Sequence, residues 1–227
     1  MKSIICSFLL LTTFCVVPFV AFSSTFTSTN PIVLPTTSNE DNGAPVPVLP
    51  ELLDIDGEPL HVDQEYHIRS IFWGAGSGAV DFARIGNTRC PNAVVFMFGD
   101  SSQGLPVKFF THGGPVVRET NDINIMFSFP KTIRCNNGTY WMVDFNPDMT
   151  ARGVRFVVTS TVLFVPNSLF QIVKSSETSP FYKIRHCPGQ GVDCEDVGLT
   201  SHKGYNRLAI TNEPFYFTFT KVSKTDA

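Results

Sequence analysis

The five histidines are the first side chains to consider for catalysis or metal binding, since imidazole serves in both. They are His61, His67, His112, His186 and His202. No two form a helical His-x3-His pair, and only His186 adjoins a cysteine. The chain also lacks a Gly-x-Ser-x-Gly elbow, a His-Glu-x-x-His motif and a phosphate-cradling glycine loop. The sequence therefore predicts no metal, no cofactor and no catalytic residue.

Two carboxylate pairs leave one enzymatic alternative open. Asp54 with Asp56, or Glu195 with Asp196, has the residue types of a glycosidase acid and base. Both pairs lie in turn-like segments, where such side chains are commonly solvated or cap the turn. We therefore expect the protein not to be an enzyme.

Composition sets the class of protein. The chain has 227 residues, 43% of them hydrophobic, and a net charge of −3, which argues against nucleic-acid binding. Lys2 precedes an apolar run with small residues after it, so residues 1–23 are predicted to be a signal peptide. Residues 24–45, rich in Ser, Thr, Pro and Asn, are predicted to be a disordered leader. After cleavage we expect a secreted protein without a membrane segment.

The folded part is predicted to be all-β. Apolar and polar residues alternate at 107–109, 123–127, 154–158 and 215–219, with turn clusters between them. Tyr66-x-Ile68 and Tyr182-x-Ile184 stand 116 residues apart, and a strand near residue 124 lies halfway. Three units of about 58 residues fit a β-trefoil, while a two-sheet sandwich is the structural alternative.

Four cysteines remain after removal of the signal peptide: Cys90, Cys135, Cys187 and Cys194. An even number in a secreted chain indicates two disulfides, but spacing alone allows three pairings. Zinc binding is the rival interpretation, and the Cys-x6-Cys spacing, with no second pair nearby, is poor for it.

The stretch from Leu52 to Ile68 resembles the N-terminal signature of the plant Kunitz family, the soybean-trypsin-inhibitor type. The matching residues are Leu52, Asp54, Asp56, Gly57, Glu58, Leu60, Tyr66 and Ile68. The cysteine spacings and the segment 208–214 are also similar to that family, and residues 23–28 resemble the leaders of its solanaceous, miraculin-like branch. The resemblance implies a β-trefoil over residues 46–222, a short tail at 223–227, and the disulfides Cys90–Cys135 and Cys187–Cys194. It also implies a protease inhibitor of plant defence, serine-type, whose partner is the target protease.

In this family the reactive loop lies between two strands, which here resemble residues 104–109 and 116–119. The resemblance therefore gives these reactive-loop candidates: Phe109, Phe110, Thr111, His112, Gly113, Gly114 and Pro115. The loop has no basic residue for a trypsin-like pocket, so Phe109 or Phe110 in a chymotrypsin-like pocket is expected instead. Arg152, in the turn-rich segment 146–153, is a second-loop candidate.

Several alternatives stay open at this point. The solanaceous relatives also include inhibitors of aspartic and cysteine proteases, and some Kunitz proteins serve storage or ligand binding, miraculin-like or lectin-like. The segment Asn30–Pro35 resembles a vacuolar sorting signal, so the vacuole is the expected location and the extracellular space the alternative. Asn137-Gly-Thr is a glycosylation sequon. We expect a monomer.

Overall fold

The computed structural model describes residues 48–72, 74–87, 90–99, 102–129, 139–148, 151–189 and 191–223. The predicted signal peptide, leader and sorting signal lie outside these ranges, as do Cys135, Asn137 and most of the tail. Those assignments stay predictions. Within the described ranges, no helix has the length and apolar character needed to cross a membrane.

The described residues form an all-β fold, as predicted, with two short 3-10 turns. The strands are β1 (Tyr66–Ser70), β2 (Gly78–Ala83), β3 (Ala93–Phe98), β4 (Val107–Thr111), β5 (Ile123–Phe127), β6 (Tyr140–Val143), β7 (Val157–Ser160), β8 (Phe170–Lys174), β9 (Tyr182–His186), β10 (Glu195–His202), β11 (Tyr205–Ile210) and β12 (Tyr216–Lys221).

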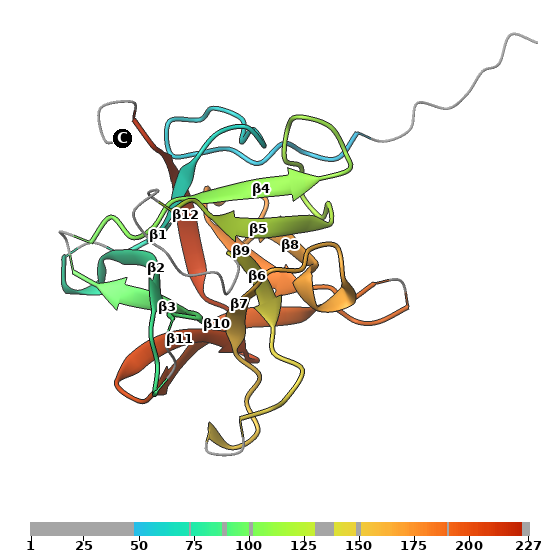
Figure 1. Cartoon of the computed structure of the whole chain (residues 1–227). Coiled ribbons are helices and arrows are strands. Elements are labelled where there is room, and N and C mark those ends of the chain that lie inside the picture. Colours follow the sequence, from blue (N-terminus) through green and yellow to red (C-terminus); the bar gives the residue numbers. More distant parts are fainter. Residues whose placement is uncertain are drawn as a thin grey trace, which may run out of the picture. The chain divides into compact units, whose positions relative to one another are not determined.

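Six of the strands close into a ring of antiparallel neighbours. β1 pairs with β4, β4 with β5, β5 with β8, β8 with β9, β9 with β12, and β12 with β1. The other strands form the hairpins β2–β3, β6–β7 and β10–β11, which gather below β4 and β5 in Figure 1. β3 joins them by pairing with both β11 and β7.

The chain runs through this arrangement in three successive groups of four strands. Their first strands, β1, β5 and β9, begin at Tyr66, Ile123 and Tyr182, at intervals of 57 and 59 residues. These starts agree with the predicted spacing. The alternating run at 154–158 contributes less strand than expected, because β7 begins only at Val157.

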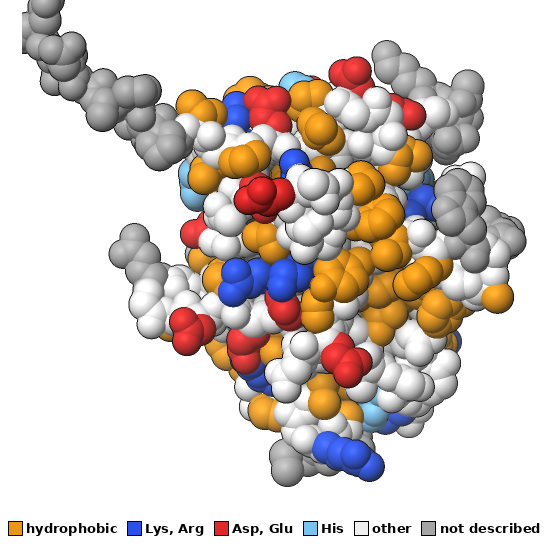
Figure 2. Space-filling view, turned by 180° about the vertical axis from the view of Figure 1, so that it is seen from behind, with side chains coloured by type: hydrophobic (Ala, Val, Ile, Leu, Met, Phe, Trp, Pro, Cys, Tyr) orange, Lys and Arg blue, Asp and Glu red, His pale blue; other side chains and the backbone are white. Residues whose placement is uncertain are grey.

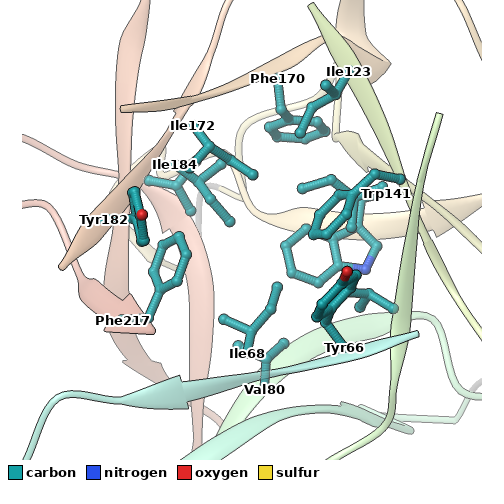
Figure 3. Close-up of a cluster of buried hydrophobic side chains, with 14 of the residues drawn as sticks. Tyr66, Ile68, Val80, Ile123, Trp141, Phe170, Ile172, Tyr182, Ile184 and Phe217 are labelled. Atoms are coloured by element: carbon teal, nitrogen blue, oxygen red, sulfur yellow. The ribbon is translucent and has the colours of Figure 1, made fainter. Parts of the chain in front are cut away.

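The core fills the space inside the ring. Side chains from all three groups point toward one another there, as Figure 3 shows for Tyr66, Trp141 and Phe217. Each is at most 2% exposed. Alternation produces this, since successive strand residues point to opposite faces and one face of every ring strand meets the core. The ring is therefore a rigid support for the loops at its ends.

One predicted disulfide is confirmed. Cys187 and Cys194 are bonded and close the short connection between β9 and β10. The other predicted pairing involves Cys135, outside the described residues, and stays a prediction.

Candidate functional site

The connection from β4 to β5 contains most of the predicted reactive-loop residues, but Phe109 is not one that a protease could contact. Phe109 is fully buried in β4, where its ring lies 6.0 Å from Tyr66 and 5.5 Å from Phe219. Phe109 is therefore inaccessible to a protease in this structure, because exposing it would open the core.

Phe110 and Thr111 are the last residues of β4 and lead into the loop. The Phe110 ring is half-buried and packs edge-on against Tyr140, with 5.7 Å between ring centroids. The Thr111 hydroxyl accepts a hydrogen bond from the Gly113 amide at 3.1 Å, which folds the chain into a turn. Both residues thus support the loop more than they extend from it.

The apex of the loop, His112 to Pro115, is exposed throughout. Gly114 has a φ of +106°, a backbone conformation that residues with a Cβ rarely adopt, and a Cβ there would meet no atom within 4 Å. At Gly113 a Cβ would lie 2.5 Å from the side-chain nitrogen of Asn121, so that amide sits directly against the loop backbone. The two central residues therefore present bare backbone to solvent.

Backbone hydrogen bonds fix the return limb of the loop to the N-terminal stretch. Val62 N–H donates to the Pro115 carbonyl at 2.9 Å. Leu52, Leu60 and Val117 form a closed cycle: Leu52 N–H donates to Val117, Val117 N–H to Leu60, and Leu60 N–H to Leu52. All three residues of the cycle are fully buried. The stretch that carries the family signature thus has a physical role, because it holds one limb of the loop in place.

Asp54 lies in the same N-terminal stretch that holds the return limb of the loop. Its Oδ1 accepts hydrogen bonds from the amides of Asp56 and Glu58, both at 3.0 Å, as expected for an Asx turn. Arg118, on the return limb, donates to the Leu49 carbonyl at 2.8 Å and to the Glu51 carboxylate at 2.7 Å. The carboxylate of Asp54 is therefore engaged in the turn, which removes the first glycosidase pair.

A second turn, between β7 and β8, lies against the apex and was missed by sequence reasoning. The Phe164 ring is 4.5 Å from the His112 ring, and Val162 and Phe164 are 48% and 42% exposed. Phe164 has a φ of +55°, and its amide donates to the buried Asn124 side chain at 3.2 Å. Four consecutive apolar residues at 162–165, followed by a proline, were the available signal.

Arg152 is exposed, but its backbone does not have the form of a substrate. Its φ is +58° and that of Gly153 is +79°. Gly153 N–H donates to the Asp148 carbonyl at 3.0 Å, and Asp148 N–H donates to Val154 at 2.9 Å. The segment is a tight turn, whereas a protease binds an extended chain. The second-loop candidate is thus unsuited to substrate-like binding in this conformation.

The second carboxylate pair and His186 are explained by local packing. Glu195 pairs with Arg155, and Asp196 lies 3.0 Å from Lys183. Burial, and after it the charge of Arg155, lowers the pKa of His186. No group of three or more His, Cys, Asp or Glu in the described ranges could hold a metal ion.

Comparison with known proteins decides the family. A model of the Kunitz legume type, described as "Trypsin and protease inhibitor", matches residues 52–221. The chain belongs to the Kunitz family of protease inhibitors. Members of this family are non-enzymatic inhibitors that bind proteases, as in the complex of soybean trypsin inhibitor with porcine trypsin. That inhibitor is 26% identical, with a TM-score of 0.63, over 76% of this chain and 99% of its own.

The individual relatives carry the names of several protease classes. Cysteine protease inhibitor 8 of Solanum tuberosum is 36% identical over 94% of this Kunitz chain and 96% of its own. Serine protease inhibitor 5 of the same plant is 35% identical, over 96% and 99%. Aspartic protease inhibitor 10 is 34% identical, over 92% and 94%. The structure of the potato cysteine protease inhibitor PCPI-3 is 41% identical, with a TM-score of 0.65, over 78% of this chain and 100% of its own.

Proposed function

We propose that this Kunitz inhibitor acts on papain-like cysteine proteases through the exposed apex His112 to Pro115. The observation that carries the proposal is an apex of bare glycine backbone held between anchored limbs. A serine protease takes an inhibitor's side chain into its S1 pocket, and Gly113 and Gly114 offer none. Side-chain-free backbone can enter a narrow cleft instead. The names of several relatives, cysteine protease inhibitors at 36% and 41% identity, agree with this class.

The anchoring of the loop is what makes inhibition reasonable. Binding orders flexible segments at a cost, and a loop already held in its bound shape avoids most of that cost. Here the Pro115 carbonyl is bonded to Val62, and Asn121 lies against Gly113. The flexibility expected of two adjacent glycines is thereby reduced.

The finer fold that we propose is the β-trefoil. It is supported by the closed ring of six strands, by three hairpins that meet at one end, and by strand starts at Tyr66, Ile123 and Tyr182. A two-sheet sandwich would leave the ring open. We further propose vacuolar delivery and a role in defence, supported by the sequence Asn30–Pro35 and by the family.

The test is inhibition of four proteases by the leader-trimmed protein: papain, chymotrypsin, trypsin and a cathepsin-D-like aspartic protease. We expect tight, stoichiometric inhibition of papain. Gly114→Arg should abolish it, because the new side chain widens the apex. Gly204→Arg is the matched control, since Gly204 is exposed, has a φ of +80° and also has open space around its Cβ position. Papain inhibition that survives Gly114→Arg would overturn the proposed site.

A second candidate is inhibition of chymotrypsin-like proteases through Phe110. The observation in its favour is that Phe110 lies two residues before the exposed apex and, unlike Phe109, is not fully buried. Chymotrypsin inhibition lost on Phe110→Ala, with no effect on papain, would favour it. No inhibition of any of the four proteases at micromolar concentration would reject both candidates and favour a storage or ligand-binding protein.

A further inference from the structure

A groove of about 950 Å³ lies on the outer face of the ring, and none of the apex residues lines it. Its floor is β12, where Phe217 and Phe219 point into the core while Thr218 and Thr220 line the groove. Its walls are the N-terminal segment, the β1–β2 connection and the β8–β9 connection. A volume of this size is typical of small-molecule sites.

The walls carry large apolar side chains that face solvent. Ile55 is 58% exposed and Phe72 is 62% exposed, and Leu53 and Phe181 also line the groove. Figure 2 shows hydrophobic side chains gathered on the face opposite that of Figure 1. Exposed apolar surface that is contiguous and hollowed commonly marks a binding site.

Two cations also line the groove, Arg69 on β1 and Lys174 at the end of β8. Within the described part of the chain, neither side chain has a hydrogen bond or an ion pair. The cations of a second depression differ, since Lys183 and Arg185 both pair with Asp196. An unpaired cation beside apolar walls attracts an anion more strongly than one in open water.

Among the described side chains that line the groove, Asp54 is the only acidic one, and it accepts hydrogen bonds from the backbone. Asp54 is 8% exposed, and its Oδ1 accepts the amides of Asp56 and Glu58. These amide bonds leave the charge of Asp54 in place, so the described lining carries two cations and one carboxylate. The groove thus combines apolar walls with an excess of positive charge.

We propose that the groove binds an amphipathic organic anion, a ligand with an apolar body and one carboxylate or sulfonate group. The apolar body packs against Ile55, Phe72 and Phe181, and the anionic group lies between Arg69 and Lys174. Thr218, opposite Arg69 in the β1–β12 ladder, offers a hydroxyl to the same group. This site is separate from the loop that we propose for protease inhibition and does not depend on it.

The test is a fluorescence titration with 8-anilinonaphthalene-1-sulfonate, compared with its uncharged analogue N-phenyl-1-naphthylamine. We expect saturable binding of one sulfonate probe per chain, displaced by dodecanoate. Replacing Arg69 and Lys174 together by Gln should weaken sulfonate binding about tenfold while leaving the uncharged probe within about twofold. Phe72→Ser should weaken both probes. Near-UV circular dichroism must show that each variant is folded.

The matched control is Arg84→Gln with Lys203→Gln, which removes one Arg and one Lys that are exposed and do not line the groove. It should leave both affinities unchanged. The proposal is overturned by the absence of saturable binding up to about 100 μM probe, or by equal losses in the groove and control variants. Papain inhibition, measured with and without probe, reports separately on the loop.

Discussion

Asn124 is a buried polar residue whose removal should strongly destabilise the protein. It is fully buried on β5, opposite Phe110 in the β4–β5 ladder. Its amide nitrogen donates to the Ser168 carbonyl at 2.6 Å and to the Ser168 hydroxyl at 2.8 Å. Its oxygen accepts the Phe164 amide at 3.2 Å. One side chain thus fixes the turn that lies against the apex of the loop.

The magnitude follows from those three hydrogen bonds. Each is worth about 1 kcal/mol net, and a buried partner left without a bond costs about 1 to 3 kcal/mol. Asn124→Ala leaves the Ser168 carbonyl and the Phe164 amide without this partner, so we expect the free energy of unfolding to fall by about 3 kcal/mol. Such a loss is large beside the stability of an ordinary domain.

Urea denaturation followed by circular dichroism measures this change. Asn212→Ala is the matched control, because Asn212 is exposed and its loss should cost less than about 0.5 kcal/mol. A double-mutant cycle with Ser168→Ala should give a coupling energy of about 1 kcal/mol. A loss below about 1 kcal/mol for Asn124→Ala would refute the reasoning, since it would mean that the turn is not held by this side chain.

Three further predictions concern other parts of the fold. Replacing Cys187 and Cys194 together by Ser should lower the free energy of unfolding by about 2.5 kcal/mol, because the disulfide closes a short loop; unchanged urea midpoints would contradict this. The lowered pKa of His186 means that unfolding takes up a proton, so stability is full above the ordinary histidine pKa and declines as pH falls below it. His186→Gln should flatten this decline between pH 8 and pH 5, and an equal slope in the variant would argue against it. Phe164→Ala should weaken papain inhibition about fivefold while changing stability by less than about 1 kcal/mol, as measured by inhibition constants and urea denaturation.

Much of the fold could be predicted from local patterns. Alternation identified the segments that become β4, β5 and β12, and the paired Tyr-x-Ile motifs gave the spacing of the three groups. These predictions succeed because one face of each ring strand meets the core, which imposes period two. The shortened β7 has a local cause, since Val154 pairs with Asp148 across a tight turn and leaves the ladder.

The site was harder to predict, for reasons that differ between residues. The burial of Phe109 follows from alternation, because Val107 and Phe109 share one face of β4 and Lys108 and Phe110 the other. Arg152 was a candidate by residue type, and only the backbone reveals its left-handed conformation. The groove is lined by segments near residues 54, 72 and 181, which are far apart in the sequence, so no local sequence pattern predicts it.

The two glycines at the centre of the apex change where the specificity of this inhibitor must arise. A side chain in a pocket normally supplies both affinity and selectivity, and Gly113 and Gly114 supply neither. Affinity must then come from preorganised backbone, which the cycle of Leu52, Leu60 and Val117 maintains. Selectivity must come from the neighbouring turn, where Phe164 offers exposed apolar surface against His112. This division of roles explains why a loop that lacks a basic residue is consistent with inhibition.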